Sequence, residues 1–237
     1  MSTARAAGAL HARERPEARA GLLGAILPPA TALSLLGLSL VLLLLPLYMH
    51  PALDAAGAPG RLGVSPAEAR ALSDRTVAEL LLGPGTFAFA GPDGRPFYGA
   101  DEAGHLRDVR LVLYGFLALV GLSSVAVAGA LARGWRRAAV WQGLARGGAG
   151  LVVLLLAGGL FAILAFELAF ELFHRLLFPG GNWAFDPGTQ RLVQLYPLAF
   201  WQLTTAALGL LASGSGVLLW FVARRRERRL RADATAP

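Results

Sequence analysis

Four long apolar stretches constrain this chain more than any other feature of its sequence. They cover residues 28–48, 111–131, 150–173 and 198–223. The hydrocarbon core of a bilayer is about 30 Å thick, and roughly 20 apolar residues in a helix cross it. Because lipid offers the backbone no hydrogen bonds, such segments must be helical. The sequence therefore predicts an all-α membrane protein whose single domain, residues 28–223, is a bundle of four transmembrane helices.

The distribution of basic residues predicts the orientation of the spans. All 22 basic residues are Arg, and residues 1–27, 132–148 and 224–237 hold four, four and six of them. Short segments rich in Lys and Arg stay on the cytoplasmic side. Both basic tails, 1–27 and 224–237, are therefore expected in the cytoplasm, with segments 51–108 and 178–197 on the outer side.

Two other interpretations of the basic residues are less favoured. A basic start before an apolar run is typical of a signal peptide, but residues 28–48 form a longer run than the usual 7–15 residues. A net charge of +7 can indicate nucleic-acid binding. Here the Arg residues flank spans and no basic patch with interleaved aromatic residues occurs, so no nucleic-acid partner is expected.

Segment 51–108 is too strongly patterned to be a plain linker. Ser65 and Glu68 have the spacing of a capping box, with Pro66 at the first helical position. An amphipathic helix is expected from there to about Leu82. The segment is therefore predicted to fold as a small extracytoplasmic cap between the first two spans.

The second half of this cap has the pattern of a β-hairpin. Residues 86–90 alternate like a strand, residues 91–94 form a turn, and residues 95–98 can pair back. Asp101 is then expected to cap a helix that continues into the span at residues 111–131.

His105 is the first candidate for chemistry. On a helix, Asp101 and Asp108 both lie close enough to reach its imidazole, and a carboxylate partner fixes the tautomer and raises basicity. Taken alone, the motif is more typical of a polar helix start that binds nothing.

His174 is the second candidate, at the outer end of the third span. On a helix, Glu167, Glu171 and His174 lie within about a 60° arc. Carboxylates in hydrocarbon are costly and usually point into the bundle at a functional site. The alternative is a polar contact with the fourth span, through Gln202, Thr204 or Thr205.

The topology brings both histidines to the same membrane level, because His105 opens the second span and His174 closes the third. Two such imidazoles can perform acid–base chemistry near neutral pH. A metal site formed by His105, His174 and Glu171 stays open as an alternative. The chain has no Cys, no His-Glu-x-x-His motif, no Walker loop and no Gly-x-Ser-x-Gly elbow.

At these segments the chain resembles a bacterial family, the lipoprotein intramolecular transacylases (Lit), over residues 25–223. The motifs that carry the resemblance are Glu102-x-x-His105-Leu106-x-Asp108-Val109, Phe173-His174-x-x-x-Phe178-Pro179-Gly180-x-Asn182-Trp183-x-Phe185-Asp186-Pro187, and Tyr196-Pro197. Leu177 departs from the pattern, since a second aromatic residue is expected before Phe178.

The resemblance implies an acyltransferase of the bacterial inner membrane that uses no cofactor. Members act at the extracytoplasmic face on diacylated lipoproteins. They move the sn-2 acyl chain to the α-amino group of the N-terminal Cys, which gives the lyso-form. Two histidines that match His105 and His174 carry the catalysis. The implied partners are the diacylated lipoprotein and the phospholipid bilayer.

Two imidazoles suit this reaction, because amine attack on an ester needs a base and a proton for the leaving alkoxide. His174 is assigned as the base and His105 to the carbonyl or leaving oxygen, with the reverse assignment left open. The residues expected to support the pair are Glu102, Asp108, Glu171, Asn182 and Trp183. Asp108 and Glu171 would orient the rings, while Asn182 and Trp183 would shape the entry. Two other functions stay open, a non-enzymatic lipid- or peptide-binding accessory protein and a metal-dependent membrane hydrolase.

Overall fold

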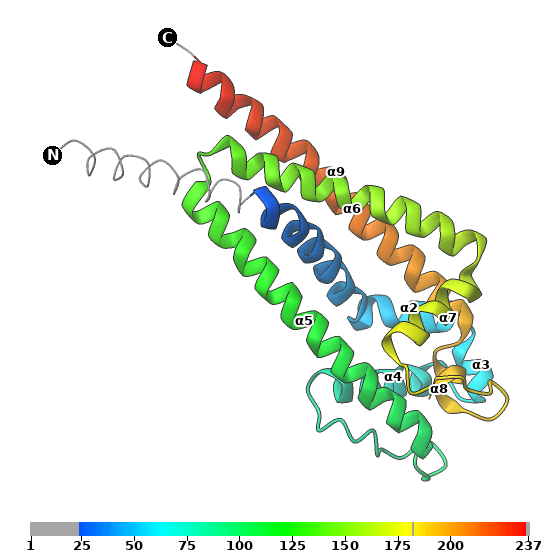
Figure 1. Cartoon of the computed structure of the whole chain (residues 1–237). Coiled ribbons are helices and arrows are strands. Elements are labelled where there is room, and N and C mark those ends of the chain that lie inside the picture. The colour runs from blue at the N-terminus through cyan, green and yellow to red at the C-terminus, as the bar shows by residue number, and fades with distance from the viewer. Residues whose placement is uncertain (1–23, 182, 236–237) are drawn as a thin grey trace. The chain divides into compact units, whose positions relative to one another are not determined.

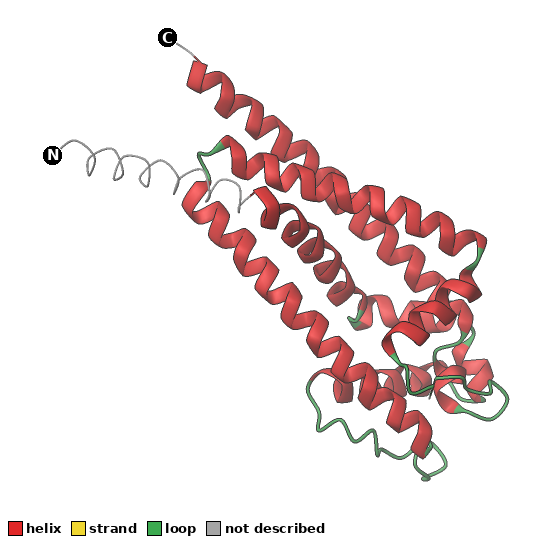
Figure 2. Ribbon diagram, in the orientation of Figure 1, coloured by secondary structure: helices red, strands yellow, loops and turns green. Residues whose placement is uncertain are grey.

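The structure, a computed structural model, describes residues 24–181 and 183–235, and this part of the chain is mostly helical (Figures 1 and 2). The helices are Gly24–Leu43, α2 (Pro46–Ala55), α3 (Ala58–Leu62), α4 (Pro66–Leu81), α5 (Ala100–Gly134), α6 (Ala138–Leu164), α7 (Phe166–Leu177), α8 (Arg191–Leu195) and α9 (Leu198–Thr235). No strand occurs among these residues.

Four of the helices are long and apolar enough to cross a membrane, namely Gly24–Leu43, α5, α6 and α9. This confirms the prediction of an all-α protein with four spans. The prediction that the cap runs directly into the second span is also confirmed, because α5 is continuous from Ala100 to Gly134. The basic N-terminal tail falls largely outside the described residues.

The third apolar stretch was expected to form one continuous helix, but the structure has two helices, α6 and α7, separated by the non-helical residue Ala165. This residue has φ −148° and ψ 55°, and α7 begins at the next residue. From Phe166 onward polar residues recur every three or four positions, so α7 is amphipathic rather than apolar all round. Its exposed side carries large apolar residues, Leu168, Leu172, Phe173 and Leu176.

The fourth helix also runs further than expected. The sequence predicted that it would end at Arg224, but α9 continues to Thr235. Glu227 stabilises the extension, since its carboxylate accepts from Arg224 Nη1 at 3.1 Å and from Arg231 Nη2 at 2.9 Å. Arg and Glu also favour helix, so a run of charge ends the membrane span without ending the helix.

The chain forms two compact units. Among the described residues, the first unit takes in 24–36, 119–155 and 212–235, and the second takes in 37–118, 156–181 and 183–211. Both candidate histidines belong to the second unit.

Glycines bring the helices of the first unit into backbone contact. A Cβ on Gly148 of α6 would lie 2.6 Å from the carbonyl oxygen of Gly216 on α9, and a Cβ on Gly147 would lie 2.5 Å from that of Pro28. Close approach through small residues is a main source of helix association in lipid, where the hydrophobic effect between helices is absent.

Replacing Gly148 by alanine is therefore expected to destabilise the protein by about 1–3 kcal/mol, the usual cost of overpacking. Backbone atoms of α9 cannot rotate away as a side chain would. Thermal unfolding in detergent micelles measures the loss. Gly150→Ala is the matched control on the same helix, because nothing lies within 4 Å of a Cβ there. Equal midpoints for the two variants would contradict the contact.

The cap of the second unit is formed by α2, α3, α4 and α8, with α3 packed against α8 and α2 against α4. The predicted capping box at Ser65 is confirmed, since the Ser65 and Glu68 side chains each accept from the backbone N–H of the other residue. The buried apolar side chains of the cap include Leu53, Phe87 and Leu195.

The predicted hairpin is present only as a single antiparallel bridge between Ala90 and Pro96. Phe97 N–H donates to the Phe89 carbonyl at 2.9 Å, but the pairing does not extend. Two residues explain this. Pro96 has no N–H to donate, and Phe87 has a φ of 55°, which breaks the extended backbone.

Candidate functional site

The two candidate histidines converge. His105 lies near the start of α5 and His174 in the last turn of α7, and their ring centroids are 6.0 Å apart with an interplanar angle of 28°. Their relative exposures are 6% and 9%, so both imidazoles are buried. The two imidazoles are therefore neighbours in the fold although 69 residues separate them in the sequence.

Aromatic side chains enclose the pair. The Phe178 ring lies 4.8 Å from His105 and 5.7 Å from His174. Phe185 lies 5.5 Å from His105, while Phe170 and Trp183 lie 4.1 Å and 5.1 Å from His174. These rings exclude water from the imidazoles, which strengthens any charge interaction formed there.

Sequence reasoning singled out Trp183 but gave no role to Phe170 or Phe178. Their signal was the spacing, because Phe170, His174 and Phe178 recur every four residues. That spacing aligns side chains on one helix face. Asn182, the remaining expected entry residue, lies outside the described residues.

A backbone carbonyl fixes the tautomer of His174. Its Nδ1 lies 2.7 Å from the carbonyl oxygen of Phe170. A carbonyl oxygen only accepts, so Nδ1 carries the proton and Nε2 keeps a free lone pair. Burial lowers the pKa of His174 below its usual 6.5, and the bond to Phe170 opposes this only in part. The imidazole is therefore neutral near pH 7, with Nε2 available as a base.

A lowered histidine pKa makes stability depend on pH in a defined direction. In the unfolded chain His174 takes up a proton near pH 6.5, whereas in the folded chain it does so only at lower pH. The unfolded state therefore binds more protons in this window, and the stability falls as the pH drops below about 6.5.

Thermal unfolding between pH 7.5 and 5 is expected to show a smaller loss of stability for His174→Gln than for the unaltered protein. Glutamine does not titrate, so the difference between the two curves reports His174 alone. Parallel curves would contradict a neutral, buried His174.

Glu102 fixes the position of the helix that carries His105. Its side chain is 4% exposed, and its Oε1 accepts from Leu192 N–H at 2.7 Å while Oε2 accepts from Gly99 N–H at 2.7 Å. One carboxylate thus joins the start of α5 to the start of α8. Asp101 does not cap α5 as the sequence predicted, because the helix already begins at Ala100 and Glu102 takes that role.

A buried hydroxyl network supports the same junction. Ser73 Oγ lies 3.0 Å from Tyr196 Oη, and Thr76 Oγ1 lies 2.8 Å from Tyr98 Oη. Burial raises the pKa of Tyr196 to about 12, so this hydroxyl stays protonated and keeps its hydrogen bond at physiological pH. The network therefore ties α4 to the residues that precede α5 and α9.

Glu171 does not orient His174 as expected, because Glu171 Oε1 pairs with Arg175 Nη2 at 2.6 Å. The Phe170 carbonyl holds the ring instead. Of the three fourth-span residues in the alternative, Thr204 accepts from Tyr48 Oη at 3.0 Å. Within residues 24–181 and 183–235, no three His, Asp or Glu side chains are grouped as metal ligands would be.

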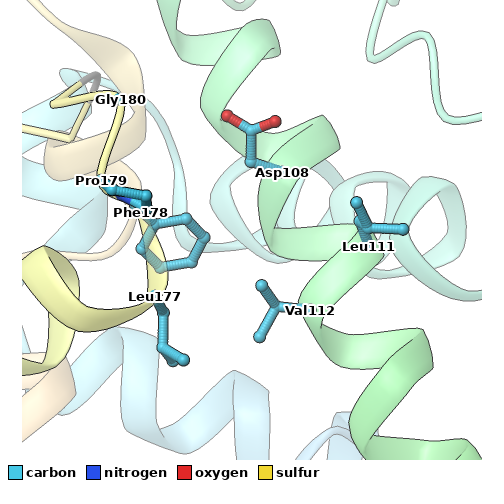
Figure 3. A pocket seen from close by; sticks show the side chains of 7 residues that line it. All are labelled: Asp108, Leu111, Val112, Leu177, Phe178, Pro179 and Gly180. Carbon is cyan, nitrogen blue, oxygen red and sulfur yellow. The ribbon is translucent and has the colours of Figure 1, made fainter.

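A pocket of about 250 Å³ lies between the first part of α5 and the residues at the end of α7 (Figure 3). The described residues that line it are Asp108, Leu111, Val112, Leu177, Phe178, Pro179 and Gly180. Phe178 both lines the pocket and contacts the two imidazoles. The walls are otherwise mostly apolar, so the pocket suits a hydrocarbon chain.

Comparison with known proteins agrees with this architecture. The structure of the membrane integral lipoprotein intramolecular transacylase of Bacillus cereus superposes with a TM-score of 0.75 at 17% sequence identity, covering 91% of this chain and 99% of that one. The same protein with a histidine-to-arginine substitution gives a TM-score of 0.71 at 16% identity, covering 95% and 99%. These matches establish the fold.

An uncharacterized protein of Aquifex aeolicus (strain VF5) is 28% identical over 130 residues, which are 54% of this chain and 57% of that relative. The match thus spans little more than half the length of the relative. The family model of the lipoprotein intramolecular transacylase Lit matches residues 82–201. That range contains both histidines and all seven described residues that line the pocket. The chain therefore belongs to the lipoprotein intramolecular transacylase (Lit) family.

Proposed function

We propose that this protein transfers the sn-2 acyl chain of a diacylated lipoprotein to the α-amino group of the lipoprotein's own N-terminal Cys. The observation that carries the proposal is the pair of buried imidazoles, 6.0 Å apart, beside an apolar pocket. Membership of the family supports the reaction type. The residue roles come from the geometry of this chain.

The reaction forms one bond and breaks one. The amine nitrogen attacks the ester carbonyl carbon, a C–N bond forms, and the C–O bond to the sn-2 oxygen breaks. One proton leaves the amine and one reaches the departing alkoxide, so nothing is gained or lost overall. Nucleophile and ester belong to the same molecule, so holding them in register replaces a bimolecular encounter.

His174 acts as the base in this proposal. Its Nδ1–H is held by the Phe170 carbonyl, which leaves Nε2 free to take the amine proton. His105, on the facing helix, hydrogen-bonds the carbonyl or leaving oxygen and delivers the proton to the alkoxide. No side chain of the protein needs to become acylated.

The apolar wall of the pocket is proposed to hold an acyl chain. Leu111, Val112 and Leu177 supply this wall beside Phe178 (Figure 3). The Arg distribution supports a site at the extracytoplasmic face of the inner membrane, with both tails in the cytoplasm. A lipid-anchored substrate in the outer leaflet then reaches the histidines without leaving the bilayer.

Purified protein and a synthetic diacylated lipopeptide test the proposal. The product must have the mass of the substrate but a changed fragmentation pattern, with the acyl group on nitrogen. A mixture of substrates with isotopically light and heavy acyl chains tests intramolecularity, because internal transfer gives no product of mixed mass. Binding without conversion would instead support an accessory lipid- or peptide-binding protein.

A further inference from the structure

Arg226 lies on the packed face of α9, unlike the arginines around it. Ala223 is buried three residues before it, and Leu230 packs four residues after it against the same apolar cluster, which contains Trp141. On a helix these spacings put Arg226 on the face that they share. The other arginines that follow the apolar part of α9 are exposed, namely Arg224, Arg225, Arg228, Arg229 and Arg231. Arg226 is thus the one directed toward the neighbouring helices of the first unit.

The guanidinium of Arg226 lies over the indole of Trp135, with Cζ 4.5 Å from the ring centroid. Trp135 belongs to the connection between α5 and α6, and its carbonyl oxygen accepts from Trp141 Nε1 at 2.7 Å. The two indole rings also meet edge to face, with centroids 6.0 Å apart. The connection is therefore held in place, and the indole offers the cation a face of negative potential.

One donor of this guanidinium has no acceptor in the structure. Arg226 Nε is buried, and no described residue accepts a hydrogen bond from it. The adjacent carboxylate is engaged elsewhere, since Glu227 accepts from Arg224 through Oε2 and from Arg231 through Oε1. A buried N–H without an acceptor is costly, and more so on a charged group. An anion that reaches Nε would remove this cost.

The surroundings of Arg226 are strongly basic. Arg136 and Arg137 directly follow Trp135 and are exposed. The described part of the first unit holds ten Arg and only two carboxylates, one of which is the engaged Glu227. Such an excess of positive charge attracts anions to the surface that carries it.

Apolar side chains adjoin the basic ones on the same helix. Phe221 and Val222 are exposed and come just before Arg224. Because α9 is long and apolar enough to cross a membrane, such side chains suit contact with acyl chains. Trp and Arg at the end of a span suit the level of the headgroups. A ligand with an anionic group at that level and hydrocarbon beside it is a phospholipid.

We infer that Arg226, supported by the indole of Trp135, binds the phosphate of an anionic phospholipid. Nε and one Nη donate to two phosphate oxygens, the bidentate geometry that suits a guanidinium. Arg136 and Arg137 attract the headgroup, and the acyl chains lie against Phe221 and Val222. The site belongs to the first unit and both histidines to the second, so this lipid is a bound ligand and not a substrate of the proposed reaction.

Native mass spectrometry of the full chain tests the inference. Protein in a non-ionic detergent receives equal amounts of phosphatidylglycerol, which is anionic, and phosphatidylcholine, which is neutral overall. The unaltered protein is expected to retain phosphatidylglycerol preferentially. Arg226→Gln should lower this preference about tenfold or more, the scale of a charge-assisted hydrogen bond. Equal retention of the two lipids by the unaltered protein overturns the inference.

Arg225→Gln is the matched control, because Arg225 lies on the same helix and also over an aromatic ring, that of Phe221 at 5.2 Å. It removes the same charge from an exposed position and should lower the preference by less than about threefold. Equal losses in the Arg225 and Arg226 variants would indicate a diffuse basic surface and overturn the inference.

Two further variants separate the contact from the charge. Arg226→Lys keeps the charge but has no Nε donor, and Trp135→Leu removes the supporting ring but no charge. Both should lose most of the preference, and a full preference in Arg226→Lys contradicts the bidentate contact. Thermal unfolding without added lipid verifies that each variant is folded.

A competition experiment distinguishes a lipid from a small anion. Excess inorganic phosphate should leave phosphatidylglycerol bound, because the acyl chains contribute to its affinity. Displacement by inorganic phosphate would identify a site for small anions and reject the lipid.

Discussion

Replacing His174 by alanine is expected to lower the rate of acyl transfer by at least about 100-fold, because a positioned general acid or base contributes about 10²–10⁴-fold. The protein should stay folded, since the lost bond from Nδ1 to the Phe170 carbonyl lies within α7 itself. Single-turnover conversion of the diacylated lipopeptide, followed by mass spectrometry, measures the loss.

His50→Gln is the matched control for this experiment. His50 also belongs to the second unit and also makes one hydrogen bond, to Asp74 Oδ1 at 2.9 Å, but it is part of the cap and does not touch the aromatic enclosure. It should retain close to full activity. His105→Ala should match the His174 variant, and the double variant should lose little more, because residues that act as a unit are not additive. Near-normal turnover by either single variant would remove that imidazole from the mechanism.

Replacing Glu102 by alanine is expected to affect both stability and catalysis. Each hydrogen bond to a charged group is worth about 1.5–3 kcal/mol. Water can satisfy part of what is lost, so a total loss of about 2–4 kcal/mol is expected. The start of α5 would also be released from α8, and His105 lies three residues further along α5. Because small displacements of a catalytic group are costly, kcat should fall about 10-fold or more even well below the unfolding temperature.

Glu79→Ala separates these two effects. Glu79 Oε2 also accepts from two backbone N–H groups, those of Thr86 and Phe87. The bond from Arg110 of α5 goes to the Glu79 backbone carbonyl, so the substitution keeps it. The variant should lose stability without a comparable loss of kcat. If the two variants lose activity in proportion to their stability alone, Glu102 has no positioning role. Glu102→Gln, which keeps one acceptor oxygen, should lie between Glu102→Ala and the unaltered protein.

Features that depend on local composition and spacing, such as the spans and the helix starts, are predicted well from the sequence. Hydropathy located the four spans, and the spacing of Ser65 and Glu68 located the start of α4. The interruption of the helix at Ala165 was not predicted, because the residues on both sides of it are apolar. Hydropathy does not report a change in the direction of a helix axis. The extension of α9 to Thr235 was not predicted either. A run of Arg residues marks the edge of the membrane, but it is not a signal for the end of a helix.

The sequence identified the two candidate histidines, but it did not identify most of the groups that hold them in place. His105 and His174 stood out because each has carboxylates on its own helix face and the topology brings both to the same membrane level. Their partners are less visible, because the Phe170 carbonyl is a backbone group and Leu192 lies 90 residues from Glu102 in sequence. A pairing that exists only after folding leaves no local pattern. The expected pairing of Glu171 with His174 was displaced by Arg175, which offers a full positive charge one turn away.

The exposed apolar side of α7 has a consequence for the reaction proposed above. Leu172, Phe173 and Leu176 present hydrocarbon to the surroundings next to His174. Amphipathic helices of this kind suit the boundary between headgroups and acyl chains, where the proposed lipoprotein substrate would diffuse within the sheet of lipid. The rate would then depend on the density of the lipopeptide in the micelle surface rather than on its concentration in the bulk solution. Diluting the lipopeptide with inert detergent at constant total amount should slow turnover, whereas diluting the whole micellar suspension with buffer should not.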